Sequence, residues 1–183
     1  MAAQTLTETL DGVAAWVETA IAADLRYLVP PEDGAVDDID LEWASPSVFQ
    51  AFVPSIERMP DGAHQAPSIA VQLVEGNDGP RDSRVITIKL VLTIWSPGHF
   101  QDDQFIRGSD GWRDLFNGLG AIVGAVESAE TIAGCAVDMK EGVRYGFYEI
   151  EREIPDLYPF WMGKVEFKLM RAPQASKRFQ DML

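Results

Sequence analysis

The sequence predicts an α+β domain in which two main helices pack on a largely antiparallel mixed sheet of about five strands. Two long segments have apolar residues at helical spacing, and five shorter ones have the alternating apolar pattern of strands. Their order along the chain is helix, three strands, helix, two strands. We expect one domain over residues 1–171, with an acidic insertion loop at 30–45 and a tail or arm at 172–183.

The first helix is predicted over residues 5–28, because apolar side chains recur there every three or four positions. Thr5 and Glu8 fit a capping box at its start. The segment 30–45 that follows carries six acids and almost no basic residue, which predicts an exposed loop. A divalent-cation loop is the alternative, although the order of the acids does not match the calcium-loop pattern.

Three strands are predicted next, in "SVFQAFVP", "PSIAVQLVEG" and "RVITIKLVLTIW". The turn formers of "EGNDGPRD" indicate a hairpin connection between the last two. In the longest strand, alternate isoleucines and leucines point one way. The opposite face mixes Lys89 and Trp95 with valines and threonines, so we expect this face of the sheet to meet another chain.

The second helix is predicted in "GWRDLFNGLGAIVGAVESAE", with Ser109 or Asp110 as its cap and Trp112 in the core. Its internal glycines each cost roughly 1 kcal/mol relative to Ala, which indicates a close approach of the helix to the sheet. These glycines are Gly118, Gly120 and Gly124. Two strands follow, in "GVRYGFYEIE" and "MGKVEFKLMR". Because Pro159 has no N–H for a ladder, the last strand is expected to begin after it.

The formal charge of −14, from 29 acids against 15 bases, argues against tight binding to nucleic acid. No apolar run approaches the roughly 20 residues that cross a bilayer, so we expect a cytoplasmic protein without a membrane contact. Cys135 is the only cysteine, which excludes an internal disulfide and a zinc site built from cysteines.

A search for catalytic residues finds no convincing constellation, so we expect neither an enzyme nor a cofactor or metal. His99 with Asp102 and Asp103 is the nearest approach to a partial metal site, but a solvated loop is favoured. "GLGAIVG" lacks the spacing and the position of a dinucleotide fingerprint. Acidic pairs are too common in this chain to indicate a glycosidase. A metal-dependent or small-molecule enzyme remains the less favoured alternative.

Four segments in order resemble the tail terminator and tail-completion proteins of long-tailed bacteriophages, of the type found in prophages. The segments are "PSIAVQLVEGNDGP", "RVITIKLVLTIWSPG", "DGWRDLFNGLGAIVGAV" and "EIPDLYPFWMGKVEFKLM", and the resemblance covers roughly residues 67–171. It implies a structural protein, made in the bacterial host cytoplasm, that forms a homo-oligomeric ring, typically a hexamer, at the virion head–tail junction.

The resemblance further implies two partners, the tail tube protein and a head-completion or connector protein. Another neck, connector or minor tail protein of similar fold is the alternative. Phe160 and Trp161 are expected to cover one end of the core, and Tyr158 to stay exposed. We predict that the protein contacts involve seven residues: Lys89, Trp95, Arg113, Asp114, Tyr158, Phe160 and Trp161.

Overall fold

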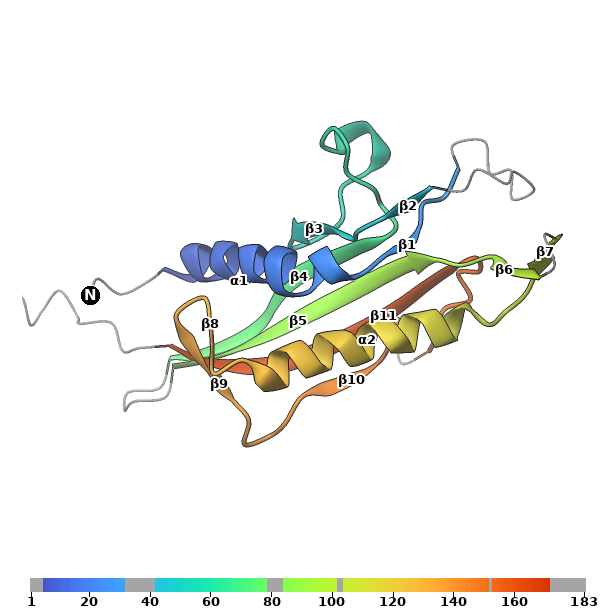
Figure 1. Cartoon of the computed structure of the whole chain (residues 1–183). Helices are drawn as coiled ribbons and strands as arrows, with labels where there is room; N and C mark the ends of the chain where they lie inside the picture. The colour runs from blue at the N-terminus through green and yellow to red at the C-terminus, as the bar shows by residue number, and fades with distance from the viewer. Residues whose placement is uncertain (1–4, 32–41, 79–83, 102–103, 152, 172–183) are drawn as a thin grey trace, which may run out of the picture.

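The computed structural model describes residues 5–31, 42–78, 84–101, 104–151 and 153–171. Within them, two α-helices pack on a curled, mixed and mostly antiparallel sheet (Figure 1). The predicted fold class is therefore confirmed. The acids at 32–41 and the tail at 172–183 lie outside the described residues, as do Asp102 and Asp103.

Helix α1 spans Leu6–Ala20 and begins with the predicted capping box. The Thr5 backbone N–H donates to Glu8 Oε2 at 2.7 Å, and the Glu8 N–H donates to Thr5 Oγ1 at 3.2 Å. The prediction that the helix continues to residue 28 is wrong. After α1 the chain makes a short 3-10 turn and enters a two-residue strand, so the later apolar residues reach the core from other conformations.

The main sheet has the strand order β3-β4-β5-β11-β9-β8, and β10 also pairs with β11. All five predicted strands are confirmed within it: β3 (Ser47–Gln50), β4 (Ser68–Asp78), β5 (Arg84–Trp95), β10 (Arg144–Phe147) and β11 (Phe160–Arg171). β5 and β11 pair antiparallel over their whole length, and β3 runs parallel to β4. β11 begins directly after Pro159, as expected.

The remaining strands were not predicted. Three of them have only two residues, too few for the apolar alternation to be visible, and the other three have four residues and lie among polar residues and turn formers. They form hairpins: β1 (Tyr27–Leu28) with β2 (Trp43–Ala44), β6 (Gly98–Gln101) with β7 (Gln104–Arg107), and β8 (Thr131–Ile132) with β9 (Cys135–Asp138). The predicted connection "EGNDGPRD" is partly strand, since β4 and β5 stay paired as far as Asp78 and Arg84.

One core lies between the helices and the sheet. The predicted inward row of β5 is buried there together with the inward row of β11: Ile86, Ile88, Leu90, Leu92, Ile94, Val165, Phe167 and Leu169. Val13 and Val17 of α1 join the same core as Leu115 and Leu119 of α2, which spans Gly111–Ser128. Both helices therefore cover one face of the sheet, here called the inner face, and among the described residues the outer face carries no helix.

The three glycines inside α2 behave differently. A Cβ on Gly118 would lie less than 3.0 Å from Tyr27 Oη and from Leu92 Cδ2, which confirms the predicted close approach. At Gly120 and Gly124 a Cβ would meet nothing within 4 Å, so the prediction is wrong there. Asp110 occupies the N-cap position but has helical dihedral angles and makes no capping hydrogen bond with its side chain.

Neither described helix combines the length and the apolar character needed to cross a membrane.

Candidate protein-contact site

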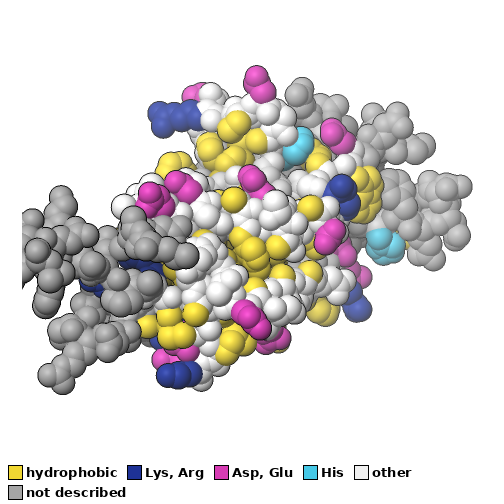
Figure 2. Space-filling view, turned by 60° about the vertical axis from the view of Figure 1, so that its left-hand side comes forward, with side chains coloured by type: hydrophobic (Ala, Val, Ile, Leu, Met, Phe, Trp, Pro, Cys, Tyr) yellow, Lys and Arg dark blue, Asp and Glu magenta, His cyan; other side chains and the backbone are white. Residues whose placement is uncertain are grey.

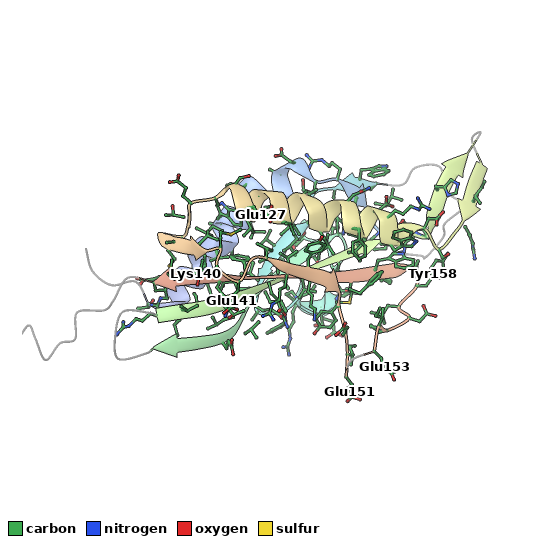
Figure 3. The ribbon with its side chains drawn as sticks, turned by 90° about the horizontal axis from the view of Figure 1, so that it is seen from below. Glu127, Lys140, Glu141, Glu151, Glu153 and Tyr158 are labelled. Atoms are coloured by element: carbon green, nitrogen blue, oxygen red, sulfur yellow. The ribbon has the colours of Figure 1, made fainter. Side chains whose placement is uncertain are left out.

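The structure brings six of the seven predicted contact residues to one end of the sheet. This is the end where β5 stops and where α2 and β11 begin, and β6 and β7 extend beyond it (Figure 1). Tyr158 lies there, far from Lys140 and Glu141 at the opposite end (Figure 3). We call this region the junction end. The seventh residue, Lys89, lies in the middle of β5.

Ser96 joins the three segments that meet at the junction end. Its backbone N–H donates to the Pro159 carbonyl at 3.0 Å, and its own carbonyl accepts from Trp161 Nε1 at 3.0 Å. Its hydroxyl donates to Asp114 Oδ2 at 3.0 Å. Ser96 is only 6% exposed, and its bonds to Asp114 and Trp161 are partly buried. Asp114 and Trp161 therefore hold the fold together at this point.

Tyr158 and Gly111 complete the junction end. The Tyr158 hydroxyl donates to the Pro97 carbonyl at 2.8 Å, although the side chain is 47% exposed, in agreement with the prediction. A Cβ on Gly111 would lie less than 3.0 Å from the Trp161 indole and from Ser96 Cβ. Only glycine thus lets the start of α2 approach β11 this closely. Trp161 packs against the core as predicted, while Phe160 is 37% exposed.

Arg113 is exposed at the start of α2. Its guanidinium carbon lies 5.0 Å from the centroid of the Trp112 ring, and its Nε lies 3.8 Å from Asp110 Oδ1. The prediction that Trp112 belongs to the core is wrong, because 41% of the side chain is exposed. Trp112 instead contacts Phe116 edge-on, and Phe116 contacts Phe147 in the same way.

Trp95, which we predicted as a contact residue on the outer face of β5, is buried within the chain. Trp95 lies on the outer face by strand alternation, but Leu28 of β1 and Ala66 form a small second core with it. Only 4% of Trp95 is exposed. Chain segments distant in the sequence therefore cover the end of the outer face.

Lys89 lies on the open part of the outer face, with its ammonium 5.7 Å from the centroid of the Tyr148 ring. Around it the outer face carries opposite charges in pairs: Arg144 with Glu166 at 3.7 Å, Lys164 with Glu149 at 3.9 Å, and Lys168 with Glu141 at 2.6 Å. In each of these three pairs the charges balance, in contrast to the strongly acidic whole chain.

Apolar side chains remain exposed at and next to the junction end, and most of them were not predicted as contact residues from the sequence. They include Trp43, Ile106, Ile154, Leu157 and Phe160, all more than a third exposed. Ile154 and Leu157 border a hollow of about 230 Å³ that Tyr158 and Phe160 also line. Such clustering is typical of surfaces that contact another molecule.

Chemically active groups are sparse in the described part of the chain. It contains no group of three or more His, Cys, Asp or Glu side chains that could hold a metal ion. His99 is exposed on β6. Cys135 is buried as predicted, and burial raises the pKa of its thiol. Burial, and then the nearby Asp114 carboxylate, raise the pKa of Tyr27 to about 12.

Comparison of the chain with protein-family models and with curated proteins finds no match in either set.

Proposed function

We propose that this chain is a structural protein of the head–tail junction of a long-tailed phage, similar to the tail terminators. It assembles as a homo-oligomeric ring, expected to be a hexamer, on the end of the tail tube. The ring contacts the tube protein on one side and a head-completion or connector protein on the other. Protein contacts, and no catalytic step, carry out this function.

The observation that carries the proposal is the meeting of the resembling segments in space. The strand ending at Trp95, the start of α2 at Gly111 and the segment from Tyr158 to Trp161 are far apart in sequence, yet hydrogen bonds through Ser96 and Pro97 join them. The three segments thus form one continuous region of the surface, as a shared contact site requires. The convergence supports a resemblance of the whole sheet-and-helix unit.

The outer face and the junction end supply surfaces for assembly. The outer face carries no helix among the described residues and contains partly exposed side chains such as Lys89. The junction end adds exposed apolar side chains such as Phe160. Contact of one surface of a copy with a different surface of the next is heterologous, and such contacts form a ring when the rotation between copies closes.

The acidic charge fits a ring through which DNA passes. Acidic side chains are spread between apolar patches over the face in Figure 2, with Lys and Arg mainly near its margins. Acids facing the bore would keep the duplex from adhering to the wall. An assembled ring with its acids gathered on the outer rim would contradict this part of the proposal.

The assembly state is the direct test. Size-exclusion chromatography with light scattering is expected to show a hexamer, or a monomer that forms rings once tail tubes are added. Electron microscopy should then show rings at the tube ends. A chain that stays monomeric with and without tubes contradicts the proposal, and monomers that bind calcium or manganese would favour the enzyme alternative.

A charge reversal at the junction end localises the contact. Arg113→Glu is expected to weaken ring formation or tube capping, because Arg113 is exposed beside the apolar side chains of that end. Arg58→Glu is the matched control, since Arg58 is also exposed but lies in the short 3-10 turn Ile56–Arg58. Equal effects of the two variants would remove the junction end from the contact.

A further inference from the structure

A cavity of about 560 Å³ opens beside the junction end, between the β1–β2 hairpin, the end of β5 and the first half of α2. Its size falls within the range of about 300–1,000 Å³ that is usual for ligand sites. Its apolar lining is formed by Leu25, Tyr27, Leu28, Trp43 and Trp95. Three of these side chains are aromatic, and one of them, Trp43, is 63% exposed at the rim.

Tyr27 supplies a buried polar group to this cavity. The side chain is only 9% exposed, and its hydroxyl makes no hydrogen bond to another described residue. Every fully enclosed side-chain polar atom in the described part of the chain has a hydrogen-bond partner. The Tyr27 hydroxyl has none, so it is not fully enclosed and opens to the cavity that Tyr27 lines. It lies against Gly118, which is also part of the lining. A buried hydroxyl gains free energy when a ligand pairs with it.

The charges at the cavity favour a cation. Asp24 and Asp114 contribute two carboxylates, and Asp114 uses only Oδ2 to accept from Ser96. Arg26 is the one Lys or Arg among the described lining residues. Its guanidinium is already occupied, because it donates to the carbonyls of Ala23 at 3.2 Å and Leu25 at 2.9 Å, and to the Ser45 hydroxyl. Arg26 keeps its positive charge, so two carboxylates against one guanidinium leave a net negative charge among the Asp, Lys and Arg side chains of the lining.

We propose that this cavity binds an organic cation, an ammonium or guanidinium group on an apolar stem. The exposed ring of Trp43 attracts a cation, and the carboxylates form charge-assisted hydrogen bonds with it. The Tyr27 hydroxyl oxygen accepts one more hydrogen bond, and the chain's charge of −14 raises the local concentration of cations. The cation belongs either to a free small molecule or to a Lys or Arg side chain of a second copy. The site does not depend on the phage function.

Two probes of nearly the same shape, one cationic and one neutral, test the cavity. Nα-acetylarginine amide and its neutral counterpart Nα-acetylcitrulline amide are titrated into the full chain, with calorimetry and NMR shifts of the backbone amides as readouts. The arginine probe is expected to bind saturably, and the citrulline probe about tenfold more weakly. Equal affinities, or no saturable binding of the arginine probe, would overturn the proposal.

Substitutions of lining residues test whether the arginine probe binds in the cavity. Asp24→Asn and Trp43→Ala remove an exposed carboxylate and an exposed ring, so the fold should tolerate both. Trp43→Ala is expected to weaken binding of the arginine probe about two- to fivefold, and Asp24→Asn by a similar factor. Glu18→Gln is the matched control, an exposed acid on α1 that is not part of the lining. A loss of the same size in Glu18→Gln would show that only the overall charge matters and would overturn the proposal.

Light scattering distinguishes the two sources of the cation. If a second copy fills the cavity, the arginine probe lowers the mass of the assembly, and Asp24→Asn does the same without the probe. If the natural ligand is a small molecule, the probe binds without changing the mass. Both results keep the cation site. A chain that fails to form rings yet binds the arginine probe would contradict the proposed phage function alone.

Discussion

Ser96 shows how much of this fold depends on one small residue. It follows β5 and connects that strand to α2 and β11 through its N–H, its carbonyl and its hydroxyl. The Ser-Pro break after the strand is visible in the sequence, but no pattern indicates that Asp114 and Trp161 will be its partners. Hydrogen bonds between segments this distant depend on the tertiary arrangement, and a single sequence read locally cannot provide it.

Tyr27 should make stability depend on pH in the alkaline range. Its pKa is raised to about 12, first by burial and then by the Asp114 carboxylate, whereas an unfolded tyrosine titrates near 10. Between these values the unfolded chain has lost a proton that the folded chain keeps. The free energy of unfolding therefore falls as the pH rises from 10 towards 12, by on the order of 1 kcal/mol at pH 11.

Tyr27→Phe isolates this effect, because phenylalanine keeps the ring and cannot titrate. Urea unfolding of both proteins at pH 8, 9, 10 and 11 is expected to show the difference in unfolding free energy moving in favour of Tyr27→Phe above pH 10. A difference that stays constant over the series would show that Tyr27 titrates normally.

At the scale of elements, α2 combines two kinds of glycine in one helix. Gly118 leaves room for Tyr27 and Leu92, while Gly120 is exposed and meets nothing. Both weaken the helix by the same intrinsic propensity. Only one of them compensates for this through close packing, so the pair separates helix propensity from packing.

We predict opposite effects for alanine at these two positions. Gly118→Ala should destabilise the protein by about 1–3 kcal/mol, since the new methyl group overlaps the Tyr27 hydroxyl and the Leu92 side chain. Gly120→Ala should stabilise it by roughly 1 kcal/mol. Urea unfolding measures both changes, and Gly124→Ala serves as a second open position. Changes of the same sign at 118 and 120 would contradict the packing account.

The sequence shows the burial pattern most clearly in the two longest strands, where apolar residues alternate over many positions. β5 and β11 are twelve residues each, and their inward rows are buried as the alternation requires. The two tryptophans next to them were assigned the wrong way round. Trp95 was expected outside and is covered by Leu28 and Ala66, while Trp112 was expected in the core and is 41% exposed. Alternation gives the face of a side chain, but other parts of the chain decide whether that face is covered.

At the scale of the whole molecule, acids and bases are unevenly placed. On the outer face Lys164, Lys168 and Arg144 each pair with a glutamate. Helix α1 carries Glu8, Asp11 and Glu18 and no basic residue. Two copies can therefore meet through the outer face with less repulsion than through α1. The net charge of −14 still opposes association of two copies through any surface.

Salt should therefore strengthen self-association rather than weaken it. Screening shortens the range of repulsion from about 10 Å at 0.1 M to about 3 Å at 1 M ionic strength, and exposed acids are screened more effectively than partly buried pairs. Light scattering is expected to show a larger oligomeric fraction at high than at low sodium chloride concentration.

A triple variant, Glu18→Gln with Glu57→Gln and Glu127→Gln, removes three exposed acids and should associate at lower salt than the unaltered chain. Sucrose in place of salt controls for a general effect of the cosolute, because it does not screen charge. Dissociation by salt would instead mean that attractive ion pairs between copies outweigh the repulsion of their net charges.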